Sequence, residues 1–444
     1  MLSAVAVRSA AIVVLLAAAA LTGGVGGASA QITSAQSMSD QSMSDQSIGQ
    51  QARTDDLAAL RQIDVPAAWS QSKGSGVTVA VLDTGVRPGT PDLTGQVTVG
   101  PDYTVGANPP GYLPPHLHGT YIGSIIAGHG SGPGGSQGVI GVAPEAKILS
   151  VRVILDDQEP GFLVYNENAE YDDAIASGIT YAVRHGAGII NMSLGSTVAT
   201  RSVRQALAYA ISHNVVVVAA AGNDGTGGHG FTPYSYPASF TGVISVAAVG
   251  VNGNRASFSD QNSSVVVSAP GVNVVGDGPG GSYLIGSGTS PASAFVAGVA
   301  ALIRSQYPRL SVVQVMQSIV SSAQRPPPGG YSPATGFGEV DAAAALAAAG
   351  RLEGPARPAG LAAGAYFGGG PGGPIVVIHR DRGLIAELIV LAIAALCLFA
   401  VVLPMLIISV RRYRRRPFPP GSLPPDPPAS AFPDPPVSPE SAGP

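Results

Sequence analysis

The sequence predicts a three-layer α/β fold in which helices flank both faces of a mostly parallel central sheet. The first observation is a series of short apolar runs rich in β-branched residues, which are typical of strands buried on both faces. The second is that helical patterns lie between many of these runs, and this alternation favours parallel βαβ units. Ligands bind such sheets in the crevice at the carboxyl ends of the strands.

The elements are predicted in chain order. The strands are residues 77–82, 146–153, 188–192, 215–220, 243–249 and 265–267. The helices are residues 118–128, 169–184, 202–213, 291–306 and 311–323. An alanine-rich run ending at Ala349 closes the domain, which is therefore predicted to span residues 57–350.

The N-terminal region is predicted to lie outside this domain. Residues 1–30 have the pattern of a secretory signal peptide: Arg8 precedes an apolar core, and the small residues 28–30 fit a cleavage site. Residues 31–56 carry a short polar repeat built from Ser, Met, Asp and Gln, and are predicted to be a disordered segment.

The C-terminal region predicts a membrane anchor. Residues 351–383 form a linker rich in Gly, Pro and Ala, and residues 384–410 form a transmembrane helix around an uncharged apolar run at 388–410. The arginine cluster at 411–416 favours a cytoplasmic tail, residues 411–444, which is basic and then proline-rich. The predicted location is the cell membrane, crossed once, with the folded domain outside the cell.

Composition excludes several classes of partner. Charged residues are 11% of the chain and the net charge is −4, with no basic patch in the folded part, so nucleic acid is excluded as a partner. The single cysteine, Cys397, lies in the apolar run and permits neither an intrachain disulfide nor a cysteine metal site. No cofactor and no metal site are predicted. The acidic pairs at 156–157 and 172–173 are weak calcium candidates, and solvated surface is their default interpretation.

A glycine-rich turn that ends on Ser290 is the strongest single feature of the chain. Pro291 and an apolar helical pattern follow it, so Ser290 is predicted to cap the helix and Pro291 to be its first residue. A hydroxyl there lies beside unpaired backbone N–H groups, which suits a nucleophile with an anion site next to it. The alternative is an ordinary serine cap.

Three further polar residues stand where predicted strands end or helices begin. Asp83 follows the strand 77–82, His118 opens a helix, and Asn223 follows the strand 215–220. Each alone could be a turn or capping residue, as in the Asn-Asp-Gly turn at 223–225. Together with Ser290 they supply what acyl transfer needs: a nucleophile, an imidazole base, a carboxylate and an amide donor for the oxyanion. His116 is an alternative base, although the Gly-Thr after His118 favours the latter.

Four motifs carry a resemblance to a known family. Asp-Thr-Gly at 83–85, His-Gly-Thr at 118–120, Ala-Gly-Asn at 221–223 and Gly-Thr-Ser at 288–290 resemble the motif set of the subtilisin-like serine proteases, over roughly residues 57–349. The resemblance implies a subtilisin-like fold, with Asp83 orienting His118, His118 as the general base and Ser290 as the nucleophile. It also implies that Asn223 and the backbone N–H of Ser290 are the oxyanion donors.

The resemblance extends to the substrate and the setting. It implies that an extended polypeptide substrate pairs with a segment and faces a pocket wall made by these residues: Ser193, Leu194, Gly195, Ala220, Ala221 and Gly222. The layout of signal, linker, single span and short tail is similar to that of the mycosins, the membrane-anchored proteases associated with type VII secretion in actinobacteria. It implies a serine endopeptidase that acts with a type VII secretion membrane complex.

Two alternatives and one departure accompany this prediction. The domain could instead be a structural subunit of a secretion complex, with proteolysis secondary or lost. An α/β-hydrolase esterase is poorly supported, because that fold needs the order Ser, Asp, His and a Gly-x-Ser-x-Gly elbow. Pro291 replaces a larger residue found in many relatives, and is predicted to hold Ser290 in an extended conformation.

Overall fold

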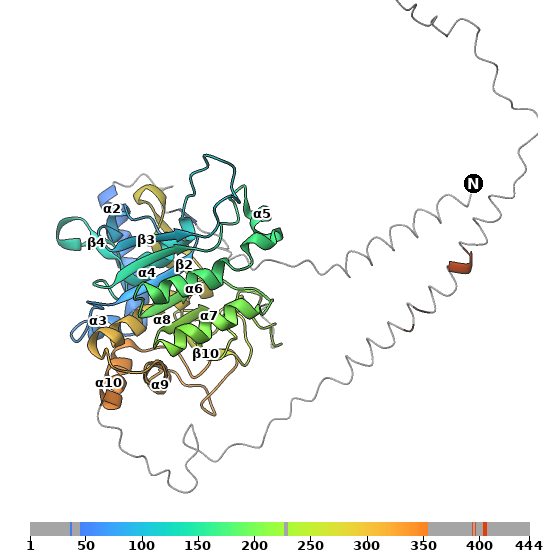
Figure 1. Cartoon of the computed structure of the whole chain (residues 1–444). Helices are drawn as coiled ribbons and strands as arrows, with labels where there is room; N and C mark the ends of the chain where they lie inside the picture. Colours follow the sequence, from blue (N-terminus) through green and yellow to red (C-terminus); the bar gives the residue numbers. More distant parts are fainter. Residues whose placement is uncertain are drawn as a thin grey trace, which may run out of the picture. The chain divides into compact units, whose positions relative to one another are not determined.

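The computed structural model describes residues 36–37, 45–225 and 230–353, with a few positions between 393 and 405. The predicted signal peptide, nearly all of the predicted linker, most of the predicted membrane span and the tail lie outside the described residues. In the part that is described, no helix is both long enough and apolar enough to cross a membrane. The chain divides after Gly360 into two units, and the first holds the whole central sheet (Figure 1).

Seven parallel strands form that sheet, in the spatial order β10-β9-β8-β7-β2-β6-β3. Their bounds are β2 Thr78–Asp83, β3 Val97–Asp102, β6 Lys147–Arg152, β7 Ile189–Met192, β8 Val216–Ala220, β9 Val243–Val249 and β10 Val265–Pro270. All six predicted strands are present. The seventh, β3, was missed because it lies at the edge of the sheet, where Val99 is 65% exposed and no continuous apolar run is needed.

Helices cover both faces of the sheet (Figure 1). On one face lie α6 Ala174–Arg184 and α7 Arg201–Ser212; on the other lie α4 Leu117–Ala127 and α8 Thr289–Gln306, with α9 Val312–Ser321 and α10 Ala342–Glu353 packed against α8. Two short helices, α3 Val65–Ala68 and α5 Phe162–Glu167, lie in connections. The three-layer prediction is confirmed, with α6 starting later than predicted because residues 169–171 form a separate turn.

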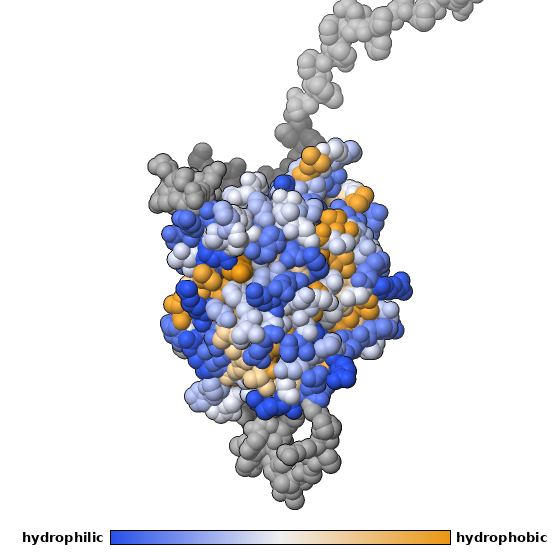
Figure 2. Space-filling view, turned by 90° about the vertical axis from the view of Figure 1, so that its left-hand side faces the viewer, coloured by the Kyte–Doolittle hydropathy of each residue, from blue (hydrophilic) through white to orange (hydrophobic). Residues whose placement is uncertain are grey.

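Burial of apolar side chains in the core holds these strands and helices together. Every residue of β8 and β9 is buried, and α8 is buried from Thr289 through Arg304. Small residues dominate α8, so it packs closely across β7, β8, β9 and β10. Full burial of each valine or isoleucine contributes about 1.5–3 kcal/mol. The surface seen in Figure 2 differs from this apolar core, since hydrophilic and apolar side chains are interspersed there.

Short antiparallel strands accompany the central sheet. β11 Val274–Asp277 pairs with β12 Tyr283–Gly286, which also pairs with β1 Gln36–Ser37. β4 His129–Ser131 pairs with β5 Gln137–Ile140. Only two residues separate the end of β12 from the start of α8. The position of this hairpin therefore determines where α8 begins, with Ser290 in its first turn.

The prediction that residues 31–56 are disordered is wrong from residue 45 onward. The helix α2 spans Asp45–Gln62 and begins twelve residues before the predicted domain start at 57. Ala52, on this helix, is fully buried. Arg53 donates to the carbonyls of Gly135 and Gln137, at 2.8 Å each, and Asp56 accepts the backbone N–H of Ile140 at 2.8 Å. The polar composition hid this helix because Arg53 and Asp56, two of the residues that dock it, bond to the backbone of Gly135 and of β5.

Asp56 predicts a pH dependence of stability. Burial, the largest influence on this carboxyl, raises its pKa from 3.8 to about 8. The folded chain then holds a proton that the unfolded chain has released, so the free energy of unfolding should fall as the pH rises from about 4 to about 8. Denaturant unfolding at pH 5 and pH 8 measures this. Asp56→Asn should flatten the decline, whereas Asp55→Asn, which removes a carboxylate bonded to Gln51 on the same helix, should not. An unchanged decline in Asp56→Asn would contradict the assignment.

Candidate active site

The carboxylate of Asp83 and the imidazole of His118 form a buried pair. Asp83 is the last residue of β2, and His118 is the second residue of α4. Nδ1 of His118 lies 2.7 Å from Oδ1 of Asp83, which also accepts the backbone N–H of Thr84 at 2.7 Å. Asp83 is fully buried and His118 is 3% exposed. Because Nδ1–H donates to the carboxylate, the basic lone pair of the neutral ring lies on Nε2.

The alternative base, His116, has a different partner. Its Nδ1 lies 2.7 Å from the carbonyl oxygen of Thr84, so this nitrogen carries the proton and donates it. The 3.4 Å approach of Arg152 Nη1 to the same nitrogen is therefore a contact between two donors and not a hydrogen bond. Burial, and then the charges of Arg152 and Arg87, lower the pKa of His116. The geometry favours His118 as the base.

Ser290 lies in the first turn of α8 and is 5% exposed. Its Oγ donates to the carbonyl of Ser193 at 3.4 Å, and among the described residues no hydrogen bond joins it to His118. The Ser290 carbonyl accepts from the hydroxyls of Ser193 at 3.1 Å and Ser293 at 2.8 Å. Bonds between a nucleophile and its base are often absent without substrate and form in the complex.

Two predictions about Ser290 are wrong. The helix begins at Thr289 after Gly288, so Ser290 is not the cap and Pro291 is not the first helical residue. Ser290 is also helical, not extended. The reason is that Asn223 binds Thr289, which starts the helix one residue before the serine. A proline in the first turn costs no intrahelical hydrogen bond, because the N–H groups of that turn have no acceptor within the helix.

Strand register brings the two halves of the site together. β2 and β7 are adjacent and parallel, and Val81 is paired with Asn191. Two residues further along each strand, Asp83 and Ser193 therefore lie side by side at the carboxyl edge of the sheet, where adjacent strands are about 4.8 Å apart. Asp83 binds His118, and Ser193 binds Ser290. The predicted carboxylate, imidazole and hydroxyl thus gather at one edge of the sheet.

Asn223 follows β8 and faces the start of α8. Its Oδ1 accepts the backbone N–H of Thr289 at 2.9 Å and the Thr289 hydroxyl at 3.0 Å. With Oδ1 engaged, the Nδ2 donors of the amide are left for another acceptor. Ser290 is the second residue of α8, where a backbone N–H has no acceptor within the helix. Two donors therefore stand near the hydroxyl, as an oxyanion site requires.

The predicted substrate residues lie on two sides of a narrow gap. Ser193, Leu194 and Gly195 follow β7; Ala220, Ala221 and Gly222 end and follow β8. Ser235 stands between them, because a Cβ at Gly195 would collide with its Oγ and a Cβ at Gly222 would come within 3.3 Å of its Cβ. A larger cavity of about 220 Å³ lies beyond Leu194 and Gly195 and includes Tyr171, Ile175 and Phe240.

A buried carboxylate, Asp260, backs the Gly222 wall, and the sequence did not single it out. It is 1% exposed, its Oδ1 accepts the backbone N–H of Asp224 at 2.9 Å, and a Cβ at Gly222 would collide with its Oδ2. Burial, and then the charge of Asp224, raise the pKa of Asp260 to about 7. Gly222, with φ of 117°, is therefore required twice: for its backbone conformation and for the space its missing side chain leaves.

The acidic pair at 156–157 is only partly solvated. Asp156 accepts the backbone N–H groups of Leu117 at 3.2 Å and His118 at 3.3 Å. Burial is the largest single influence on the His118 pKa and lowers it, but Asp83, and then Asp156 and Asp157, outweigh burial and raise that pKa above its ordinary value. The site therefore favours the protonated imidazolium more than water does.

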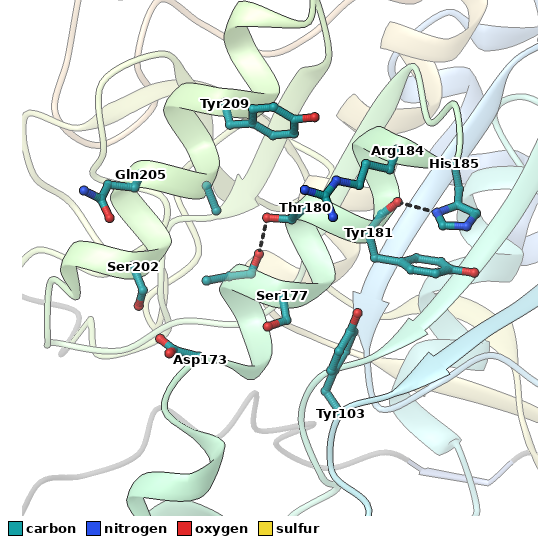
Figure 3. Close-up of a pocket in the computed structure, with 12 residues that line it drawn as sticks. Tyr103, Asp173, Ser177, Thr180, Tyr181, Arg184, His185, Ser202, Gln205 and Tyr209 are labelled. Atoms are coloured by element: carbon teal, nitrogen blue, oxygen red, sulfur yellow. Dashed lines mark hydrogen bonds between the residues drawn. The ribbon is translucent and has the colours of Figure 1, made fainter.

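A roomier hollow lies away from this site, between α6 and α7 (Figure 3). Its volume is about 600 Å³, and its lining includes Tyr103, Arg184 and Tyr209. The ring of Tyr181 stacks on that of His185, with 3.7 Å between centroids. None of the predicted site residues lines it. Over the described residues, no group of three or more His, Cys, Asp or Glu side chains is arranged to hold a metal ion.

Comparison with known proteins identifies the family. The sequence model of the subtilase family, peptidase family S8, matches residues 74–338. The chain is a subtilase. Subtilases are serine endopeptidases, so this chain is one as well. It is 41% identical to thermitase of Thermoactinomyces vulgaris over 246 residues, which cover 55% of this chain and 81% of that protein. It is 39% identical to subtilisin DY of Bacillus licheniformis over 253 residues, covering 56% and 85%.

Solved structures agree with the fold of this subtilase. The MycP3 protease from the type VII (ESX-3) secretion system aligns with a TM-score of 0.54 and 32% identity, over 65% of this chain and 87% of that one. MycP1 from the ESX-1 type VII secretion system aligns with a TM-score of 0.56 and 29% identity, over 65% and 85%. These alignments bear out the subtilisin-like fold with its mostly parallel central sheet.

Proposed function

We propose that this subtilase cleaves polypeptides with Ser290 as nucleophile, His118 as general base and Asp83 as the residue that orients His118. The observation that supports this proposal most directly is the 2.7 Å bond between Nδ1 of His118 and Asp83, which leaves Nε2 free to accept a proton. The parallel register of β2 with β7, whose following residue Ser193 binds Ser290, supports the proposal. Attack requires the Ser290 hydroxyl to turn from the Ser193 carbonyl toward Nε2 of His118.

The chemistry follows in two halves. Nε2 of His118 takes the Ser290 proton as Oγ attacks the scissile carbonyl carbon, and Asp83 stabilises the imidazolium that forms. Nε2 then gives the proton to the leaving amine, and the acyl group stays on Oγ. Water, deprotonated by the same nitrogen, attacks the ester, and Nε2 then returns this proton to Ser290 Oγ as the second product leaves. Asn223 Nδ2 and the Ser290 N–H stabilise the oxyanion in both halves.

The oxyanion role makes Asn223→Ala a quantitative test. Loss of one preorganised donor should lower kcat by roughly 10²–10³-fold with little change in KM, since the donor acts on charge that develops only in the transition state. Steady-state kinetics on a peptide substrate measures both constants. Asn252→Ala, in an exposed turn, is the control and should match the wild type. A kcat within threefold of the wild type would remove Asn223 from the oxyanion site.

The substrate is proposed to be an extended polypeptide that runs along residues 193–195. Ser235 narrows the first pocket between Gly195 and Gly222, which favours a small side chain there. The 220 Å³ cavity beyond Leu194 is lined by aromatic and aliphatic groups, including Tyr171 and Phe240, and fits a larger apolar side chain of the same peptide.

The cellular setting is proposed from sequence layout and from structural relatives. The apolar run at 388–410 and the arginines after it support a single membrane anchor with the protease domain outside the cell. The resemblance to MycP1 and MycP3 supports action with a type VII secretion membrane complex. Membership of the mycosin branch accounts for both the membrane anchor and the action with a type VII secretion complex.

Proteolysis is tested on the purified full chain. It should hydrolyse unfolded casein and a library of short peptides, and a fluorophosphonate should abolish both activities. Unfolded casein left intact, together with no cleavage anywhere in the library, would contradict the proposal.

A second candidate rests on the low exposure of Ser290, 5%, which suits a docking subunit whose catalytic site is closed. In that case the folded protein should resist the fluorophosphonate and its partners should still assemble with Ser290→Ala.

A further inference from the structure

The N-terminus of α4 is capped from a distant part of the chain. The residue before the helix, His116, has a left-handed backbone with φ of 49° and makes no side-chain bond to the helix. The first two N–H groups, on Leu117 and His118, donate instead to the two carboxylate oxygens of Asp156. Asp156 comes nearly 40 residues later, from the loop that follows β6. It supplies the anionic cap that helix N-termini favour.

This cap acts on the backbone of the catalytic histidine itself. The next N–H along, that of Gly119, donates to the hydroxyl of Thr84 at 3.0 Å. The ring of His118 is held at the same time by Asp83. The histidine is thus fixed from the β2 side through Thr84 and Asp83, and from the β6 side through Asp156.

Asp156 is in turn held in place by a buried ion pair. Its own N–H donates to Oε1 of Glu159 at 3.0 Å, and Oε2 of Glu159 accepts from Nη2 of Arg152 at 2.7 Å. Arg152 is the last residue of β6, and both members of the pair are at most 4% exposed. A chain of hydrogen bonds therefore links Asp156 through Glu159 to Arg152 at the end of β6.

The charges around His118 leave Asp156 with an effect of its own. The groups that face this region are Asp83 from β2, His116 before α4, and Arg152, Asp156, Asp157 and Glu159 from β6 and its loop. Arg152 is paired with Glu159, and burial together with the charges of Arg152 and Arg87 lowers the pKa of His116. Burial raises the pKa of Asp156 to about 6, with the His118 charge opposing, so Asp156 is ionised in neutral solution.

We propose that Asp156 is a positioning residue for His118, which fixes the histidine backbone through two N–H bonds and holds a negative charge beside its ring. The inference rests on the proposed role of His118 as general base. It assigns one carboxylate two separable effects, one on geometry and one on the proton affinity of the base.

Two substitutions separate those effects. Asp156→Asn removes the charge but keeps one oxygen that can accept an N–H, whereas Asp156→Ala removes both. Both variants should move the acid limb of kcat/KM to lower pH by about half a unit to one unit, because a carboxylate that favoured the imidazolium is gone. The plateau of kcat should fall roughly 10- to 100-fold in Asp156→Ala, the cost of a displaced catalytic group, and recover most of that loss in Asp156→Asn.

Asp157→Asn is the matched control. Asp157 is the exposed neighbour, so its charge is screened and its loss should shift the acid limb by less than half as much and leave the plateau unchanged. An Asp156→Ala protein that folds, with both plateau and acid limb of the wild type, would overturn the proposal. So would shifts of equal size in the Asp156→Asn and Asp157→Asn proteins.

An NMR titration of the His118 ring keeps the test independent of turnover. The pKa of the ring should drop in Asp156→Asn by the same amount as the acid limb, and an unchanged value would also overturn the proposal, even if Asp156→Ala did not fold. A wild-type chain that cleaves no peptide would remove the proposed function while the titration still reported on the contact. The two failures are therefore distinguishable.

Discussion

Ser290→Ala should lower kcat by on the order of 10⁶-fold, the cost of removing the nucleophile of such a triad. Without Oγ no acyl-enzyme forms, and the residual rate comes from binding and from the oxyanion donors, which alanine leaves in place because its backbone N–H is unchanged. His118→Ala should cost about as much, and the double variant no more than either single one, since the two residues act as a unit. Single-turnover kinetics with an activated peptide ester measures the loss.

Ser305→Ala provides the control for Ser290→Ala. Ser305 lies near the other end of α8, where its hydroxyl donates to the carbonyl of Ser75 at 2.7 Å. Its loss should leave kcat unchanged. If the Ser290→Ala protein retained more than about a hundredth of the wild-type rate, the nucleophile would have to be another residue.

Asp83→Asn should lower kcat by about 10⁴-fold. Oδ1 of Asp83 accepts from both Thr84 and His118, so an asparagine NH₂ group in that position loses both bonds and meets the imidazole. An NH₂ group can only donate, which forces the proton of the neutral ring onto Nε2 and removes the base that faces Ser290. The fold should be retained, because the two side chains have nearly the same shape.

The pH profile distinguishes this mechanism from simple misfolding. The Asp83→Asn protein should melt within a few degrees of the wild type, and its remaining activity should rise with hydroxide concentration, since an external base must replace His118. A loss of less than tenfold would show that Asp83 does not set the tautomer of His118.

Most of the sheet could be predicted because its buried strands have a recognisable sequence pattern. Strands such as β8 and β9 are buried on both sides, so their sequences are continuous apolar runs. The edge strand β3 and the helix α2 could not be predicted in this way. β3 has an exposed flank, and α2 is docked by Arg53 and Asp56, whose partners are backbone atoms more than eighty residues away. No local pattern encodes such contacts.

The candidate site likewise contains residues that a local sequence pattern could identify and residues that it could not. Asp83, His118 and Ser290 could be selected because each stands where a strand ends or a helix starts. Asp156 occupies an equivalent place after β6, yet an acidic pair in a loop is most often solvated surface, and only the N–H groups it meets on α4 reveal its role. Asp260 was missed because its importance lies in the space left by Gly222. The start of α8 was misplaced because Asn223, a distant residue, binds Thr289.

The central claim is that the Ser290 hydroxyl is activated by His118 in the folded protein. The most direct measurement is peptide mapping by mass spectrometry after the native full chain has reacted with a fluorophosphonate. One phosphonyl adduct is expected, on Ser290, and it should not form in the His118→Ala protein or in protein that is denatured before labelling. An adduct on a different serine, or equal labelling of Ser290 with and without His118, would contradict it.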